Sequence, residues 1–325
     1  MEAASDSTLA GGMVQRRVGR SGLTVSRLGL GTLSWGSETD AAEAAEQLAI
    51  FADAGGTLID TAPHYGAGHA EELLGALLHK TVRREDMVVA TKAGIGLRGR
   101  DLTVDISRRA LLDTLDLSLA RLDTDHVDLW QVHVFDPAAA LDETLSALDH
   151  ALASGRTRYV GVSNHAGWEL ARTATLQESS PAHARIVSDQ VEYSLLNRGA
   201  EAEVLPAAAA LGVGVLAWAP LGGGVLTGKY RSGKTPTDSR AGRYDTLDRY
   251  LVPAARRVVD AVATAAKGLG AAPLEVALAW VRDRPGVTAA IVGTRTVTQL
   301  REVLAAEAVT LPAEIRTALD DVSAP

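Results

Sequence analysis

The stretch GTLIDTAPHYGAGHAEELLGALLH, residues 56–79, contains the unit from which the fold is predicted. A short apolar run, 56–62, precedes a loop of glycine and polar residues, and an amphipathic segment, 69–79, follows that loop. The run has the length and composition of a buried strand, and the segment after it has helical spacing. The stretch is therefore expected to form one strand–loop–helix unit.

The same order of segments recurs along most of the chain. Apolar runs lie at 26–32, 56–62, 86–92, 127–133, 158–164, 186–193, 213–220 and 288–294. Helical patterns lie between or after them at 39–54, 69–79, 106–122, 138–153, 169–176, 201–211 and 297–306. Strands that alternate with helices indicate parallel β/α units, and about eight such units close naturally into a (β/α)8 TIM barrel.

The alternative α/β fold, a doubly wound dinucleotide-binding sheet, usually has fewer strands and begins with a G-x-G-x-x-G fingerprint. Here the closest match starts with Gly29 and Gly31 inside the first run, but Ser34 stands where the third glycine is required. The barrel is therefore the preferred prediction.

The chain before and beyond the barrel units is also informative. VQRRVG and LTVSRLG flank Ser21 and Gly22, a pattern that predicts an antiparallel hairpin closing the bottom of the barrel. Residues 1–13 are expected to be a disordered leader, and 14–325 a single catalytic barrel domain. The stretch 222–250 has no strand or clear periodicity, and such a long loop after a barrel strand is typical of a lid or binding loop.

Composition excludes several kinds of function. The 325 residues contain no cysteine, which rules out disulfides, thiolate metal sites and thiol nucleophiles. The net charge of -8 argues against nucleic acid or an anionic membrane as the main partner, although a local basic pocket can still bind a polyanion. Neither a signal peptide nor a spanning helix is recognisable, so a cytoplasmic protein is expected, as a monomer or a homo-oligomer.

The active site of such a barrel is built at the carboxyl ends of the strands. The polar or aromatic residues that end the apolar runs are Asp60, Lys92, His133, Ser163, Asn164, Gln190, Glu192 and Trp218. A buried lysine requires a partner to keep its charge, and Asp60 on the neighbouring run is the obvious one. A structural ion pair is the competing interpretation, and a metal site is not expected beside a lysine.

Tyr65 follows Asp60 in the same loop. A phenol titrates near ~10 in water, and a nearby ammonium favours its ionised form. With Lys92 beside Tyr65 and the imidazole of His133 available to orient a substrate oxygen, the group could deliver a proton to a carbonyl. The other histidines, including His64, His69 and His165, are interpreted as surface or supporting residues.

These residues and their surroundings resemble the aldo-keto reductases. The resemblance extends from about residue 17 to 304, through GLGT (29–32), YGAGHAEELLG (65–75), RYVGVSN (158–164), QVEYSLLNR (190–198), WAPLGGGVLTGKY (218–230) and VGTRTVTQL (292–300). It is strongest to the bacterial and potassium-channel β-subunit-like branch. It implies NADPH-linked reduction of aldehydes or ketones, with Tyr65 as general acid, Lys92 and Asp60 as its tuning pair, and His133 orienting the carbonyl.

The resemblance also implies a cofactor site for NADPH (NADP+). The implied contacts are Thr32, Asp60, Ser163, Asn164, Gln190, Trp218, Pro220, Leu221, Gly223, Lys229, Arg240, Gly293, Arg295, Gln299 and Glu302. Asn commonly follows the last of these in the family, whereas Val303 stands here, so one adenine contact is expected to be lost and the preference over NADH is left open. Trp35 is expected either to wall the substrate pocket, together with Tyr65 and His133, or only to pack.

Two further functions are compatible with these residues. A scarce lysine at a strand end is also typical of a Schiff-base enzyme such as an aldolase. A redox-sensing module similar to potassium-channel β subunits would bind NADPH with little turnover. The loops 94–103 and 222–250 contain no fixed cluster that would demand a carboxylate, phosphate or steroid, so they are expected to shape the pocket for small or varied carbonyl compounds.

Overall fold

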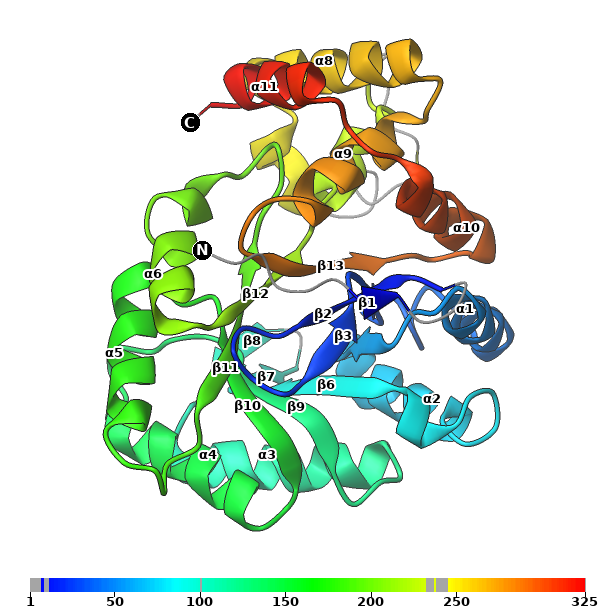
Figure 1. Ribbon diagram of the computed structural model, residues 1–325. Coiled ribbons are helices and arrows are strands. Elements are labelled where there is room, and N and C mark those ends of the chain that lie inside the picture. The colour runs from blue at the N-terminus through cyan, green and yellow to red at the C-terminus, as the bar shows by residue number, and fades with distance from the viewer. Residues whose placement is uncertain (1–6, 9–11, 100, 232–236, 238–244, 325) are drawn as a thin grey trace.

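The computed structural model describes residues 7–8, 12–99, 101–231, 237 and 245–324. Eight parallel strands form a closed barrel in chain order, with the last strand paired to the first (Figure 1). They are β4 (Leu28–Gly31), β5 (Leu58–Asp60), β6 (Val88–Ala93), β9 (Val127–Val132), β10 (Thr157–Ser163), β11 (Ile186–Glu192), β12 (Gly214–Trp218) and β13 (Val287–Gly293). The predicted (β/α)8 barrel is confirmed, and each strand lies within or beside its predicted run.

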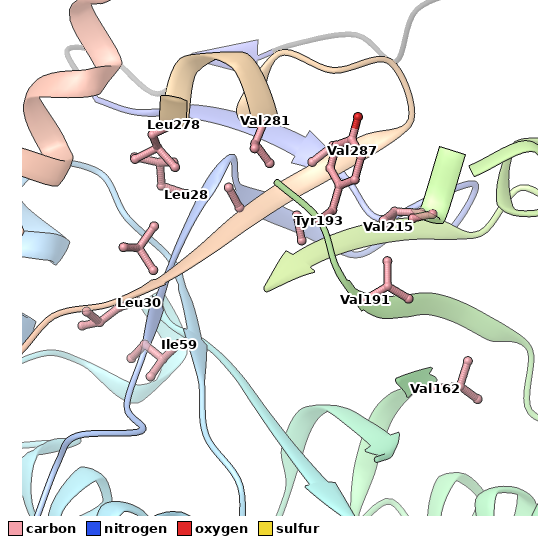
Figure 2. Packing of buried hydrophobic residues seen from close by; sticks show 14 of the residues in the cluster. Leu28, Leu30, Ile59, Val162, Val191, Tyr193, Val215, Leu278, Val281 and Val287 are labelled. Atoms are coloured by element: carbon pink, nitrogen blue, oxygen red, sulfur yellow. The ribbon is translucent and has the colours of Figure 1, made fainter. Parts of the chain in front are cut away.

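Helices cover the outside of the barrel. They are α1 (Ala41–Asp53), α2 (His69–Leu77), α3 (Arg108–Arg121), α4 (Leu141–Ala153), α5 (Gly167–Glu178), α6 (Val204–Leu211), α8 (Pro253–Leu269), α9 (Pro273–Arg282), α10 (Val297–Ala305) and α11 (Ala313–Val322). Figure 2 shows Leu278 and Val281 of α9 beside Leu28 and Val287, whose side chains project from the outer face of the strands. This apolar layer between strands and helices is the main core.

Alternation along the strands divides the barrel interior into two levels. Leu58, Ala90 and Leu129 share an apolar cluster at the lower level. Two residues further along the same strands, where the side chains again point inward, stand Asp60, Lys92 and Gln131. The polar residues are therefore gathered at the carboxyl ends of the strands.

The predicted hairpin is present and closes the bottom of the barrel. Strands β2 (Val14–Arg17) and β3 (Thr24–Ser26) are antiparallel and lie across one end of the barrel in Figure 1. Val18, Leu23 and Val25 are buried in the lower apolar cluster inside the barrel. The hairpin therefore shields that end of the interior from water.

The sequence predicts a disordered leader over residues 1–13, but part of this leader is ordered in the structure. Ser7–Thr8 form a two-residue strand, β1, that pairs with β2, and Met13 is buried in the core. Residues 1–6 and 9–11 lie outside the described part of the chain. Ser7–Thr8 are thus attached to the hairpin through backbone pairing, and the amide of Met13 donates to Ala54 O.

Several elements of the structure are not expected from the sequence pattern. Helices α8, α9 and α11 follow the long stretch 222–250, and β7 (Ile95–Arg98) and β8 (Asp101–Val104) form a hairpin within the predicted loop 94–103. Short 3-10 turns are η1 (Tyr65–Gly68), η2 (Arg84–Asp86), η3 (Gly199–Glu201), η4 (Gly222–Thr227), η5 (Asp245–Tyr250) and η6 (Ala306–Ala308). The helix predicted from residue 201 begins at Val204, after η3.

Among the helices that the structure describes, none is by itself long and apolar enough to cross a membrane. The pair α8 and α9, bent by 100°, passes that test only when both helices are taken together.

Candidate active site

The candidate site begins with three side chains from successive strands of the barrel. Asp60 ends β5, Lys92 lies one residue before the end of β6, and His133 directly follows β9. Strands β5, β6 and β9 are neighbours, and Lys92 is in register with Gln131, two residues before His133. All three side chains are buried, so barrel topology brings them together as predicted.

Asp60 and Lys92 form a buried ion pair. The Lys92 Nζ atom donates to Asp60 Oδ1 at 2.8 Å and Oδ2 at 2.7 Å, and to the backbone carbonyl of Thr61 at 3.0 Å. Gln190 Nε2 donates to Asp60 Oδ1 at 2.7 Å. Burial opposes the charge on Lys92, but Asp60 and the phenol of Tyr65 outweigh it, and the pKa of Lys92 is raised above its usual value.

Tyr65 is the first residue of η1, in the connection between β5 and α2. Its half-buried ring faces the ion pair, with the Lys92 Nζ atom 5.4 Å from the ring centroid. The phenol of Tyr65 is, after Asp60, the second group that favours the charged form of Lys92 and raises its pKa. The structure therefore joins all four residues that the sequence singled out for proton delivery, because Tyr65 contacts the pair and His133 lies beside it.

The imidazole of His133 is held in its neutral form. Burial, with the positive charge of Lys92, lowers the pKa of His133 to about 2. Its backbone is fixed on both sides, since the amide donates to Ala93 O at 2.8 Å and the carbonyl accepts from Asn164 Nδ2 at 3.0 Å. A neutral imidazole can donate to or accept from a substrate oxygen, as the predicted orienting role requires.

His64 is the residue of this site that sequence reasoning passed over. Its ring centroid lies 4.8 Å from that of Tyr65 and 5.0 Å from that of His133. Burial and then Lys92 lower the pKa of His64 to about 4, so this imidazole is also neutral near pH 7. The available signal was its position directly before Tyr65 in the loop.

Four of the predicted cofactor residues form one hydrogen-bonded group at the barrel mouth. Trp218 Nε1 donates to Asn164 Oδ1 at 3.0 Å, and Asn164 Nδ2 also donates to Ser163 Oγ at 3.1 Å. Ser163 Oγ donates in turn to the backbone carbonyl of Gln190 at 2.8 Å. Asn164 is exposed, with a left-handed φ of 56°, so its amide is presented to whatever occupies the mouth.

The glycine-rich loop after β12 has a left-handed backbone at three successive glycines, and the amides of Gly222 and Gly224 donate to Ala219 O and Leu221 O. Gly222, Gly223 and Gly224 have φ values of 55°, 63° and 92°, which residues with a Cβ rarely adopt. A Cβ at Gly224 would come within 3.0 Å of Lys229 Nζ, so the ammonium lies directly over this loop. Pro220 is buried and Leu221 half-buried at the entry to it. The loop and lysine fit a pyrophosphate.

The predicted adenosine end lies at the start of α10. Gly293 ends β13, and Gln299 Oε1 accepts the backbone amide of Arg295 at 2.9 Å. The Arg295 side chain lies 3.4 Å from Glu38 Oε2, and Glu302 is exposed. Val303, at the position where Asn was expected, is buried in the core. Arg240 lies outside the described residues.

Two further predicted contacts lie at or near β4. Thr32 is buried and donates through its hydroxyl to the backbone carbonyl of Asp60 at 3.2 Å. Trp35 is fully buried within the main core. This position fits the prediction that Trp35 only packs. The other prediction, that Trp35 walls the substrate pocket, stays a prediction.

No cluster of three or more His, Asp or Glu side chains that could hold a metal ion occurs within the part of the chain that the structure describes. The geometry instead combines a buried ion pair, a phenol and two neutral imidazoles below a rim of amides and a glycine-rich loop.

Comparison with known proteins agrees with this geometry. The model of the aldo/keto reductase family matches residues 27–324, so the chain belongs to the aldo/keto reductase family. It is an oxidoreductase family whose members act on small carbonyl substrates and generally use NAD(P)H.

Three relatives show the breadth of this group. The chain is 38% identical to the uncharacterized oxidoreductase YrpG of Bacillus subtilis, over 94% of each chain. It is 35% identical to a probable voltage-gated potassium channel subunit beta of Oryza sativa, over 89% of this chain and 90% of the relative. It is 33% identical to the L-glyceraldehyde 3-phosphate reductase of Escherichia coli O157:H7, over 90% and 87%.

Proposed function

We propose that the chain is a single-domain, cytoplasmic, NADPH-dependent reductase that converts aldehydes or ketones to alcohols, with Tyr65 as the proton donor. The observation that carries this proposal is the position of the Tyr65 ring beside Lys92, whose Nζ atom lies 5.4 Å from the ring centroid and whose charge is held by both oxygens of Asp60. A phenol beside a fixed positive charge gives up its proton more readily than a phenol in water.

The residues of the rim and of the adjoining loop fit the cofactor. Asn164 and Trp218 present polar atoms and an indole at the mouth, where the nicotinamide would be held, and the three glycines with Lys229 would take the pyrophosphate. When bound, NADPH would supply a hydride from its nicotinamide C4. Arg295 would contact the 2′-phosphate that distinguishes NADPH from NADH.

The chain's own residues then have separate tasks. His133 is neutral and would hold the carbonyl oxygen close to Tyr65. Tyr65 would transfer its phenolic proton to that oxygen as the carbonyl carbon is reduced. Lys92 would stabilise the phenolate that is left, and Asp60 keeps Lys92 charged in a buried site.

The geometry favours this reaction over a Schiff-base mechanism at Lys92. A Schiff base requires an unprotonated amine that can reach the substrate. The Lys92 ammonium is fully buried, donates to three oxygen atoms of Asp60 and Thr61, and has a raised pKa. Borohydride added together with a carbonyl substrate is therefore expected to trap no adduct at Lys92.

The test combines binding with turnover. Mixing with NADPH is expected to change the fluorescence of the cofactor, and a panel of aldehydes and ketones run with NADPH and NADH is expected to show reduction. Tyr65→Phe is expected to lower kcat by about 10²–10⁴-fold while NADPH still binds, since only the acid is removed. Unchanged turnover in this variant, or no fluorescence change, would refute the proposal.

A second candidate function follows from the relative named as a potassium channel subunit beta. In that case the chain would bind NADPH as a sensor and turn over slowly. Tight NADPH binding without reduction of any carbonyl in the panel would favour this function, and rapid reduction would exclude it.

A further inference from the structure

The loop that carries His64 and Tyr65 has a strained backbone. Gly66, Ala67 and Gly68 have φ values of 56°, 57° and 102°, all in the left-handed region. Ala67 has a Cβ, so its conformation costs energy that the surroundings must supply. A loop of this kind depends on contacts with other elements to keep its side chains in place.

Arg121, in the last turn of α3, contacts both ends of this loop. Its Nη1 atom donates to the backbone carbonyl of Pro63 at 3.2 Å. Its guanidinium also lies against Gly68, where a Cβ would fall 2.4 Å from Cζ. The glycine thus provides the space that the guanidinium occupies, and the arginine lies across the chain on either side of Tyr65.

Arg121 is held in turn by Glu71, a fully buried residue of α2. Glu71 Oε2 lies 3.4 Å from Arg121 Nη1, and Glu71 Oε1 accepts from Thr91 Oγ1 at 2.7 Å. Thr91 directly precedes Lys92 in β6. A continuous path of contacts therefore joins the strand that carries Lys92 to the loop that carries Tyr65.

We propose that Arg121 is a positioning residue for Tyr65, and that with Glu71 it fixes the distance between the phenol and Lys92. This inference rests on the proposed proton-donor role of Tyr65. Arg121 touches the loop backbone rather than the phenol or Lys92, so its influence on the reaction is exerted entirely through the placement of Tyr65.

Placement matters here because proton transfer and charge stabilisation both depend on short distances. A displacement of about 1 Å of a reacting group can cost about 10²-fold in rate. If the loop moves away from Lys92, the ammonium also stabilises the phenolate less, and the phenol becomes a weaker acid. A loss of positioning should therefore make the Tyr65 phenol a weaker acid and also lower kcat.

The experiment compares Arg121→Ala and Arg121→Lys with the wild-type protein. The alanine variant is expected to lose about 10–100-fold in kcat, with the Kd for NADPH changed by less than about threefold. The lysine variant keeps the charge beside Glu71 but has only a single ammonium, so an intermediate loss is expected. Added methylguanidinium is expected to restore part of the rate of the alanine variant.

A second readout requires neither cofactor nor turnover. Ultraviolet difference titration, with the spectrum of Tyr65→Phe subtracted, isolates the ionisation of Tyr65 from that of the other tyrosines. In both Arg121 variants the titration is expected to move to higher pH than in wild type, and the basic limb of the kcat profile should move with it.

The matched control is Arg109→Ala, because Arg109 is on the same helix with a side chain that is 91% exposed and pairs with Asp113. It is expected to leave kcat and the Tyr65 titration unchanged. If both Arg121 variants are folded and keep the wild-type titration and kcat, the positioning role is wrong. Failure of the wild type itself to reduce any carbonyl would instead refute the proposed function, and the titration would still test the placement of Tyr65.

Discussion

The ammonium of Lys92 lies within 2.8 Å of both carboxylate oxygens of Asp60, and both side chains are buried inside the barrel. Removing one partner of such a pair leaves an isolated buried charge, which costs more than the pair itself contributes. Stability and activity therefore depend on this pair in different ways, and the two can be separated.

Asp60→Asn and Lys92→Met are each expected to lower the free energy of unfolding by about 3–5 kcal/mol, since each leaves the other charge unpaired. The double variant removes both charges, so we expect it to recover most of that loss. It should nevertheless stay inactive, because nothing then tunes Tyr65. Urea unfolding and carbonyl reduction, measured on all three variants, check this, and a double variant as unstable as the sum of the singles would contradict it.

The barrel was predictable because its strands are short apolar runs separated by helical patterns, and because Asp60, Lys92 and His133 each end such a run. The β7–β8 hairpin was not predictable in this way. Its side chains are largely exposed, Leu102 by 65%, so burial imposes no periodic pattern on the sequence. Helices α8 and α9 lie together in one connection between β12 and β13, where a regular unit has a single helix.

The parts of the site that sequence reasoning missed depend on contacts between distant segments. His64 gains its surroundings from His133, which is on another strand, and Arg121 reaches Pro63 from the end of α3. Neither residue ends an apolar run or belongs to a short motif with a known chemistry. The packing of the elements brings Arg121 to the site, and the only sequence signal for His64 is its position directly before Tyr65.

The three buried or half-buried imidazoles predict an acid-sensitive protein. Burial lowers the pKa values of His64 and His165 to about 4 and that of His133 to about 2. A histidine in the unfolded chain titrates near ~6.5, so the unfolded state binds more protons between these values. The free energy of unfolding should therefore decrease as the pH falls from about 6.5 to 4.

His64→Gln removes one of these titrating groups. We expect the slope of the unfolding free energy against pH to become smaller in this variant below about pH 6.5, as measured by urea unfolding. His126→Gln is a suitable control, because His126 makes its contact with exposed Asp125 near the surface. An unchanged slope in His64→Gln would contradict the lowered pKa.

Asp189 is expected to make the folded protein less stable as the pH rises, whereas the buried histidines make it less stable as the pH falls. It is fully buried on β11, and neither carboxyl oxygen has a close hydrogen-bond partner in the described part of the chain. Burial raises the pKa of Asp189 to about 8; the backbone amide of His165 offsets little of this, and the charge of Glu169 adds to it. The folded state thus binds a proton that the unfolded state releases above about pH 3.8, so stability is lost as the pH rises towards 8.

Asp189→Asn has almost the same shape and cannot ionise. We expect it to raise the free energy of unfolding at pH 8 by about 1–3 kcal/mol, because the folded state no longer has to keep a carboxyl group protonated, or bury its charge, at a pH where the unfolded chain ionises it freely. The gain should shrink as the pH is lowered towards 4, and Asp248→Asn, at an exposed position of η5, should show neither effect. A variant that is less stable than wild type at pH 8 would show that the carboxylate is needed.

The bond between Trp218 and Asn164 offers a test of the proposed nicotinamide end of the cofactor site. Trp218 Nε1 donates to Asn164 Oδ1 at 3.0 Å, and the same amide donates to His133 O, so one side chain links β10, β12 and the residue after β9. Trp218→Phe keeps an aromatic ring but loses this donor, so the amide of Asn164 is held only through Nδ2, by its bonds to His133 O and Ser163 Oγ. A neutral hydrogen bond contributes about 1 kcal/mol, which corresponds to roughly fivefold in affinity.

NADPH fluorescence titration of Trp218→Phe is therefore expected to show about a fivefold higher Kd than wild type. Trp168→Phe, whose indole is 55% exposed on α5, is the control and is expected to show no change. An unaltered Kd in Trp218→Phe would mean that the orientation of Asn164 is set by its bonds to His133 and Ser163 without help from the indole.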